Sequence, residues 1–110
     1  MKKVLFVDDE PKVLDGLRRM LYPLRHEWTM AFACNGREAL KLLSETAYDV
    51  LVTDLRMPEV DGIELLTEAI RSHPQLVRIV LSGTADHEMT LRSVALAHQY
   101  LMKPCDAATL

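Results

Sequence analysis

A chain of 110 residues is long enough for one compact hydrophobic core and too short for two, so we expect a single domain over residues 1–110. Apolar residues make up 49% and charged residues 26% of the chain, and no apolar run approaches the roughly 18 residues of a membrane-spanning helix. The formal net charge is −3 with scattered basic residues, which argues against direct binding to nucleic acid. We expect a cytoplasmic protein, because the first apolar run is much shorter than that of a signal peptide.

The cysteines and histidines show no spacing typical of metal ligands. Cys34 and Cys105 form no C-x-x-C pair and lie far apart in the sequence, so we interpret both as buried or partly buried free thiols. The histidines show no H-x-x-x-H spacing, and we expect all of them at surface or packing positions. A thiolate or imidazole metal site is therefore not expected.

Short apolar runs predict strands at four places, residues 4–7, 50–52, 79–81 and 100–102. Continuous apolar runs of this length are typical of strands that are covered on both faces, as in a parallel sheet. A fifth strand is predicted over residues 28–33, where the larger Trp28, Met30 and Phe32 alternate with smaller residues. This alternation favours an edge strand with one less crowded face.

Helical patterns separate the predicted strands. The first helix begins at Pro11, a residue favoured at the first helical position. Its apolar residues recur on one stripe that consists of Val13, Leu14, Leu17, Met20, Leu21 and Leu24. The second and third helices open with Asn35 and Asp61, each followed three residues later by a glutamate, which resembles a capping box. A fourth helix is predicted over residues 85–97.

Strands that alternate with helices in a chain this short predict a doubly wound α/β domain with a five-stranded parallel sheet and right-handed crossovers. The edge-like second strand favours the strand order 2-1-3-4-5. Only six residues follow Lys103 and Pro104. We therefore expect the fifth helix to be incomplete and an output domain to be absent from this chain.

Polar residues follow the predicted strands at the point where each strand ends. Asp8 and Asp9 follow the first strand, Asp54 the third, Ser82 the fourth and Lys103 the fifth. Because the carboxyl ends of parallel strands meet at the same edge of a sheet, we expect these side chains to share one pocket. Three carboxylates in one pocket repel one another, and a hard divalent cation relieves that repulsion. Magnesium (Mg²⁺) suits oxygen ligands, and the hydroxyl and ammonium groups suit a phosphoryl oxygen.

Four segments in this order and spacing resemble the receiver domain of two-component response regulators: LFVDDEP, DVLVTDLRMPEVDG, RIVLSGTAD and YLMKP. The resemblance extends over essentially the whole chain. It implies a flavodoxin-like fold and a phosphoacceptor in a phosphorelay that is not an enzyme and has at most slow self-dephosphorylation. Asp54 matches the phosphoacceptor, which receives its phosphoryl group from a phosphohistidine of a histidine kinase or of a phosphotransfer protein.

The resemblance also implies a metal site beside the phosphoacceptor. Mg²⁺ is expected to bind Asp8, Asp9, Asp54 and the backbone carbonyl of Arg56. Asp9 is expected to bind the metal directly and Asp8 mainly through water. The side chain of Arg56 lies at a family position that influences the lifetime of the aspartyl phosphate.

Further implied roles concern the response to phosphorylation. Ser82 and Lys103 are expected to contact the phosphoryl group, and Tyr100 matches an aromatic switch position on the face formed by the fourth helix and the fifth strand. The segment LAHQYLMKPCD is similar to receivers that precede HD-type output domains, so the protein's own output domain is an expected partner. A homodimer is also expected, because an incomplete last helix would expose apolar surface.

Other functions are compatible with parts of this pattern. Asp8 and Asp9 could open a turn before a helix whose N-terminus favours acids. A pseudo-receiver that acts only as a docking module would keep the fold without phosphorylation. A phosphatase with an aspartate nucleophile would need a second aspartate where Arg56 stands, and a mononucleotide-binding domain would need a glycine- or hydroxyl-rich phosphate loop after the first strand.

Overall fold

The structure, a computed structural model, describes residues 2–54, 60–82 and 99–102. Its parallel sheet has the strand order β2-β1-β3-β4-β5. The strands are β1 (Lys2–Val7), β2 (Trp28–Ala33), β3 (Val50–Asp54), β4 (Val77–Ser82) and β5 (Gln99–Met102). The predicted α/β fold and the order 2-1-3-4-5 are confirmed, and β2 is an edge strand, as its alternating pattern predicted.

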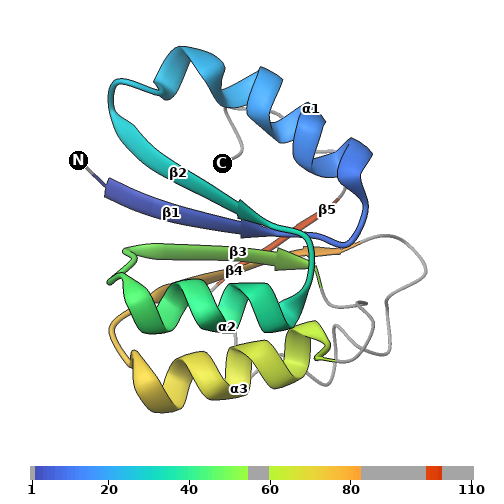
Figure 1. The fold of residues 1–110 in the computed structure, drawn as a ribbon. Helices are drawn as coiled ribbons and strands as arrows, with labels where there is room; N and C mark the ends of the chain where they lie inside the picture. The colour runs from blue at the N-terminus through green and yellow to red at the C-terminus, as the bar shows by residue number, and fades with distance from the viewer. Residues whose placement is uncertain (1, 55–59, 83–98, 103–110) are drawn as a thin grey trace.

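Helices lie on both faces of the sheet (Figure 1). They are α1 (Pro11–Leu21), the 3-10 turn η1 (Tyr22–Leu24), α2 (Gly36–Glu45) and α3 (Gly62–Ser72). α1 covers one face, whereas α2 and α3 lie side by side on the other. The predicted fourth and fifth helices fall outside the described residues. No helix in the described part of the chain is both long enough and apolar enough to cross a lipid bilayer.

Side chains of β1 alternate between the two faces and contribute to two hydrophobic clusters. Val4 and Phe6 belong to the cluster beneath α1, and Leu5 and Val7 belong to the cluster beneath α2 and α3. All four side chains are at most 4% exposed. Burying a side chain of this size contributes roughly 1.5–3 kcal/mol. Both halves of the core therefore depend on β1.

α1 begins where predicted and ends earlier than its apolar stripe suggests. Pro11 occupies the first turn, where a missing N–H leaves no helical bond unmade. Leu17 and Leu21 are buried as predicted, but the α-helix ends at Leu21 and Leu24 belongs to η1. Pro23 explains the change, because it has no N–H for the hydrogen bond that would continue the α-helix.

The two helix starts that resemble capping boxes carry the expected N-cap hydrogen bond. Asn35 Oδ1 accepts from the Glu38 N–H at 2.7 Å, and Asp61 Oδ1 accepts from the Glu64 N–H at 2.9 Å. Each bond satisfies an N–H group that has no partner within its helix, and losing such a cap typically costs about 1 kcal/mol. The caps therefore define where α2 and α3 begin.

Gly36, the first residue of α2, allows a close approach between two segments. A Cβ at this position would clash with the carbonyl oxygen of Val60 and lie 2.9 Å from its Cβ. Val60 directly precedes Asp61, the N-cap of α3, so this contact sets the spacing between the starts of α2 and α3. Gly16 in α1 is different, because an added Cβ there would have nothing within 4 Å.

These glycines provide a matched pair of substitutions. Gly36→Ala is expected to lower the free energy of unfolding by about 1–3 kcal/mol, because the backbone at Val60 must move. Gly16→Ala is expected to raise it by roughly 0.5–1 kcal/mol, because alanine favours the helix and restricts the unfolded chain. Urea denaturation measures both changes, and a Gly36→Ala protein as stable as the parent would contradict the close contact.

Candidate functional site

The carboxyl ends of the strands bring two of the predicted acidic residues to one edge of the sheet. Asp8 follows β1 directly, and Asp54 is the last residue of β3. The parallel register pairs Val7 with Thr53, so the next residue on each strand comes opposite the other. Since neighbouring strands lie about 4.8 Å apart, Asp8 and Asp54 are neighbours at this edge.

Both aspartates are nearly inaccessible to solvent. Asp8 is 0% exposed and Asp54 is 4% exposed. The Asp8 N–H donates to the carbonyl oxygen of Ala33 in β2 at 3.1 Å, and Asp8 Oδ1 accepts from the Glu10 N–H at 2.9 Å. Buried carboxylates are costly unless their oxygens are engaged. This edge of the sheet therefore contains two buried carboxylates next to an apolar core.

Thr53 holds the backbone beside Asp54. Its side chain is fully buried, and its Oγ1 donates to the Asp54 carbonyl oxygen at 2.8 Å. This hydrogen bond satisfies the buried hydroxyl. Thr53 was not among the predicted site residues, although a hydroxyl within an otherwise apolar strand was a signal that could have found it.

Asp8, Asp9 and Glu10 form a group of acidic side chains whose carboxylates converge. One oxygen from each lies within 4.8 Å of the other two. Oxygen ligands without His or Cys match the preference of Mg²⁺, so this donor set fits the predicted metal. Glu10 was not predicted, and its backbone lies beside Asp8 because it is the N-cap residue of α1. Among the described residues, Asp54 is not a member of this group.

The remaining predicted site residues are placed in part. Ser82 is the last residue of β4 and stands in register with Met102, the last residue of β5. Tyr100 lies within β5. Lys103 follows β5 directly in the sequence, but it and Arg56 fall outside the described residues. The carboxyl ends of β4 and β5 thus lie at the same edge of the parallel sheet as the two aspartates.

The family of the chain follows from comparison with known proteins. The model of the response regulator receiver domain family matches residues 4–110. The chain belongs to this family. Receiver domains are phosphoacceptor modules of two-component signalling and typically bind Mg²⁺, which agrees with the acidic group at the sheet edge.

The receiver domain is similar to known proteins over nearly all of its length. The hydrogenase transcriptional regulatory protein HoxA of Cupriavidus necator is 39% identical over 103 residues, which cover 92% of this chain and 21% of HoxA. The signal receiver domain of an HD domain-containing protein from Pseudomonas fluorescens Pf-5 matches with a TM-score of 0.89 and 29% identity, over 98% of this chain and 86% of that one. The response regulator TrrA of Thermotoga maritima, in complex with Mg²⁺-BeF, matches with a TM-score of 0.80 and 32% identity, over 94% and 87% of the two chains. The chain spans about half or less of the length of the curated relatives that it matches.

Cys34 directly follows the last residue of β2, and its thiol is not buried or partly buried as predicted. Its thiol is free but exposed, not buried, because the chain leaves the sheet after Ala33. The thiol donates to Glu38 Oε2 at 3.3 Å, and this hydrogen bond, followed by desolvation and the charge of Glu38, raises the pKa of Cys34. The thiol of the receiver domain is therefore accessible but poorly ionised at neutral pH. Cys105 falls outside the described residues.

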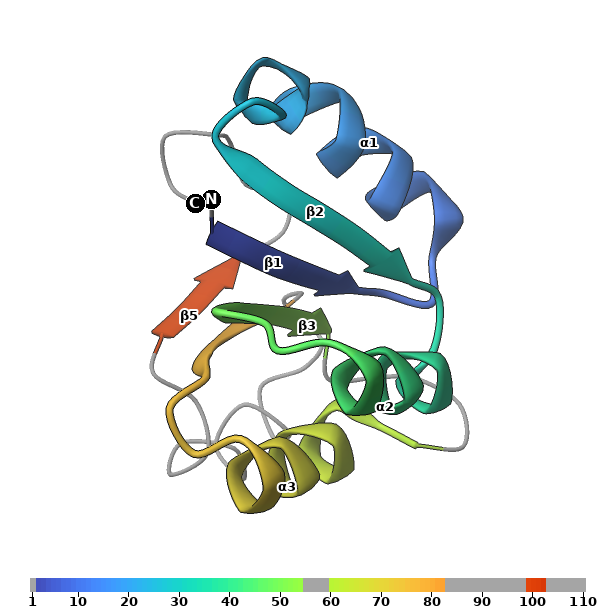
Figure 2. The ribbon, with the colours of Figure 1, turned by 60° about the vertical axis from the view of Figure 1, so that its left-hand side comes forward.

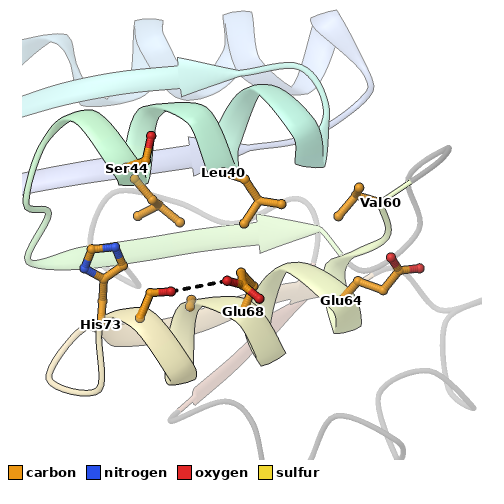
Figure 3. A pocket seen from close by; sticks show the side chains of 9 residues that line it. Leu40, Ser44, Val60, Glu64, Glu68 and His73 are labelled. Atoms are coloured by element: carbon orange, nitrogen blue, oxygen red, sulfur yellow. Dashed lines mark hydrogen bonds between the residues drawn. The ribbon is translucent and has the colours of Figure 1, made fainter.

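A groove of about 380 Å³ lies between α2 and α3 (Figure 3) and contains none of the predicted site residues. Its lining consists of Leu40, Leu43, Ser44, Val60, Glu64, Glu68, Ala69, Ser72 and His73. Arg71 Nη2 and Ser72 Oγ donate to Glu68 Oε1 at 2.8 and 3.3 Å, and the Arg71 bond is the main cause of the lowered pKa of Glu68. Such exposed pairs contribute little to stability. Because none of the acidic site residues lines it, this groove is separate from the acidic site.

Mg²⁺ is expected to stabilise the receiver domain, because a cation at the acidic group binds only the folded state. At a free concentration ten times its Kd, it should add about 1.4 kcal/mol to the free energy of unfolding. Asp9→Asn is expected to remove most of this gain, whereas Glu45→Gln, an exposed acid outside the group, should keep it. Thermal unfolding at increasing Mg²⁺ measures the effect, and an unchanged response in Asp9→Asn would contradict the site.

The raised pKa of Cys34 predicts slow alkylation. Glu38→Gln removes the negative charge that disfavours the thiolate, so the rate of reaction with iodoacetamide at pH 8 is expected to increase. The measurement uses a Cys105→Ser background, in which Cys34 is the only thiol. Glu45→Gln serves as the control with the same charge change elsewhere, and a rate increase equal to that of Glu38→Gln would contradict the proposed contact.

Proposed function

We propose that this receiver domain accepts a phosphoryl group on the carboxylate of Asp54, from a phosphohistidine of a histidine kinase or of a phosphotransfer protein. The observation that carries the proposal is the position of Asp54, which is 4% exposed at the end of β3 and stands across the sheet edge from Asp8. The strand holds its backbone in a fixed place, and Thr53 Oγ1 is bonded to its carbonyl oxygen. Phosphoryl transfer depends mainly on such positioning and on electrostatic stabilisation.

The proposed reaction forms one bond and breaks one bond. A carboxylate oxygen of Asp54 bonds to phosphorus while the bond between phosphorus and the imidazole nitrogen breaks. The imidazole nitrogen keeps the electron pair of that bond, and the ring remains on the donor protein as a neutral histidine after proton exchange. The product is an aspartyl phosphate, and no oxidant or additional reactant is required.

The acidic group beside Asp54 supports a role for a divalent cation. Asp8, Asp9 and Asp54, together with the backbone carbonyl of Arg56, are the proposed ligands of Mg²⁺. Bound Mg²⁺ would offset the charge of the incoming phosphoryl group. The similar receiver TrrA forms a complex with Mg²⁺-BeF, which supports a role for Mg²⁺ but does not identify its ligands. Glu10 lies within the same acidic group, and we propose that it adds negative charge to the site.

Ser82 and Lys103 are the proposed contacts of the phosphoryl oxygens, one through a hydroxyl and one through an ammonium group. Ser82 ends β4, and Lys103 follows β5 by one residue, so both come from the strands beyond β3. Tyr100, within β5, is the proposed switch residue. New contacts to the phosphoryl group need to differ by only a few kcal/mol between two states to invert their populations. The side chain of Arg56 is proposed to alter the lifetime of the aspartyl phosphate.

The signal is proposed to pass to an output domain or to another protein. HoxA is named as a transcriptional regulatory protein, and the Pseudomonas receiver comes from an HD domain-containing protein. These two relatives suggest two output classes for a receiver of this kind. We propose that residues 1–110 are the phosphorylated part of such a regulator. A second copy of the chain, in a homodimer, is one further proposed partner.

Phosphorylation with a small-molecule donor tests the proposal. Incubation with acetyl phosphate and Mg²⁺ is expected to add one phosphoryl group to the intact mass, and the adduct should disappear in Asp54→Asn. Asp49→Asn, an exposed aspartate just before β3, is the control that should still be modified. Omission of Mg²⁺ is expected to suppress the adduct.

Each alternative function predicts a different result in the same assay. A protein that remains unmodified under these conditions would support a pseudo-receiver that acts only by docking. Repeated release of inorganic phosphate, with many turnovers for each protein molecule, would support a phosphatase. Equal modification of the parent and Asp54→Asn would contradict Asp54 as the acceptor.

A further inference from the structure

The outer edge of β2 has no partner strand in the described part of the chain, and the strand carries no charged side chain. β2 is the first strand in the sheet order and pairs only with β1 among the described strands (Figure 2). Its sequence, WTMAFA, contains no charged residue, proline or glycine. Edge strands usually carry such residues to prevent pairing with another chain. The backbone groups on the outer side of β2 are therefore suited to receive an additional strand.

A hollow of about 470 Å³ lies beside this edge. Arg18, Tyr22 and Arg25 line it from α1 and the segment that follows, and Trp28, Thr29, Met30 and Phe32 line it from β2. We call this surface the β2 groove. Three of these β2 residues, Trp28, Met30 and Phe32, share one face of the strand, because side chains two apart point to the same side. An added strand would place every second side chain in this groove.

Two arginines are held in place at the groove by aromatic rings. The Arg18 guanidinium carbon lies 4.5 Å from the centre of the Phe32 ring, and that of Arg25 lies 3.7 Å from the centre of the Tyr22 ring. Tyr22 is 59% exposed, although it is a large aromatic residue. Arginine stacked on a ring keeps N–H donors at its edge for a carboxylate. No described residue that lines the groove is acidic.

The charge of the groove argues against a second copy of the chain as the added strand. A twofold axis between two β2 strands would place the Phe32 end of one against the Trp28 end of the other. The Arg18 of each copy would then approach the Arg25 of the other copy, and like charges across an interface are unfavourable. An acidic partner removes this conflict.

We propose that the β2 groove binds an extended acidic polypeptide, which adds to the sheet as a strand beside β2. Arg18 stacks on Phe32, and Arg25 lines the same groove as Trp28, four residues before Phe32, so two acidic side chains about four residues apart would match the two arginines. Between them, an apolar side chain faces Met30. The recognised pattern is therefore acid-x-apolar-x-acid, with main-chain hydrogen bonds for affinity and side chains for selectivity.

A peptide titration tests this inference. The probe is the peptide Ac-TETVTET-NH2, added to the ¹⁵N-labelled chain of residues 1–110 while the amide signals of β2 are followed by NMR. Binding is expected to shift β2 signals and to weaken with salt. The double variant Arg18→Ser/Arg25→Ser is expected to bind about tenfold more weakly, since two charged contacts with the peptide are lost. Arg19→Ser, a neighbouring charge that does not line the groove, should bind like the parent.

Two control peptides separate charge from strand addition. Ac-TKTVTKT-NH2 reverses the charges, and a version of the probe with methylated alternate amides keeps the charges but removes backbone donors. Neither should bind, and binding of either one as tightly as the probe would overturn the proposal. Equal loss in Arg19→Ser, tighter binding of a single-stranded dT oligonucleotide, or dimerisation through β2 in sedimentation experiments would overturn it too. These outcomes do not depend on phosphorylation of Asp54.

Discussion

The position of the acidic residues at the sheet edge depends on one constraint, the parallel register between β1 and β3. In this register Val7 stands opposite Thr53, which is why the aspartates that follow them meet at the sheet edge. A slip by one residue would turn every side chain of a strand toward the opposite face. Both faces of β1 are apolar, but each is packed around its own side chains, Val4 and Phe6 on one side and Leu5 and Val7 on the other, so a slip would cost packing. The packing of the core therefore also positions the acidic edge.

The strands could be predicted from the sequence, but β1, β4 and β5 begin earlier than their apolar runs. Strands buried on both faces are rich in continuous apolar runs, so such runs identified four of the strands, and the alternating pattern identified β2. β1 begins at Lys2 and β4 at Val77, each two residues before its apolar run. Lys2 and Lys3 are exposed and join the sheet through backbone pairing alone. The hydrophobicity of their side chains therefore does not indicate that they belong to a strand. The end of α1 was missed because Pro23 interrupts a stripe whose spacing continues to Leu24.

The positions of acidic residues could be predicted where they follow from topology, and were missed where they depend on local hydrogen bonds. The proximity of Asp8 and Asp54 follows from parallel strands that end together. The inclusion of Glu10 depends on the turn between β1 and α1, and the exposure of Cys34 depends on where the chain leaves β2. Neither the position of Glu10 nor the exposure of Cys34 follows from the spacing of apolar residues, so the sequence pattern did not predict them. Strand positions alone predicted only that these residues lie at one edge of the sheet. The family resemblance supplied the individual role expected of each residue.

The strand order has a consequence for the way the sheet is assembled during synthesis. Of the five strands, β1 leaves the ribosome first, and β2 and then β3 pair on its two sides. β4 and β5 follow on the outer side of β3, each beside the strand made before it. Every new strand thus joins an edge that is still open, and no pair already formed has to separate to admit a later one. A nascent chain can therefore extend this sheet in the order of translation, which leaves the earliest strand, β1, paired on both sides, between β2 and β3.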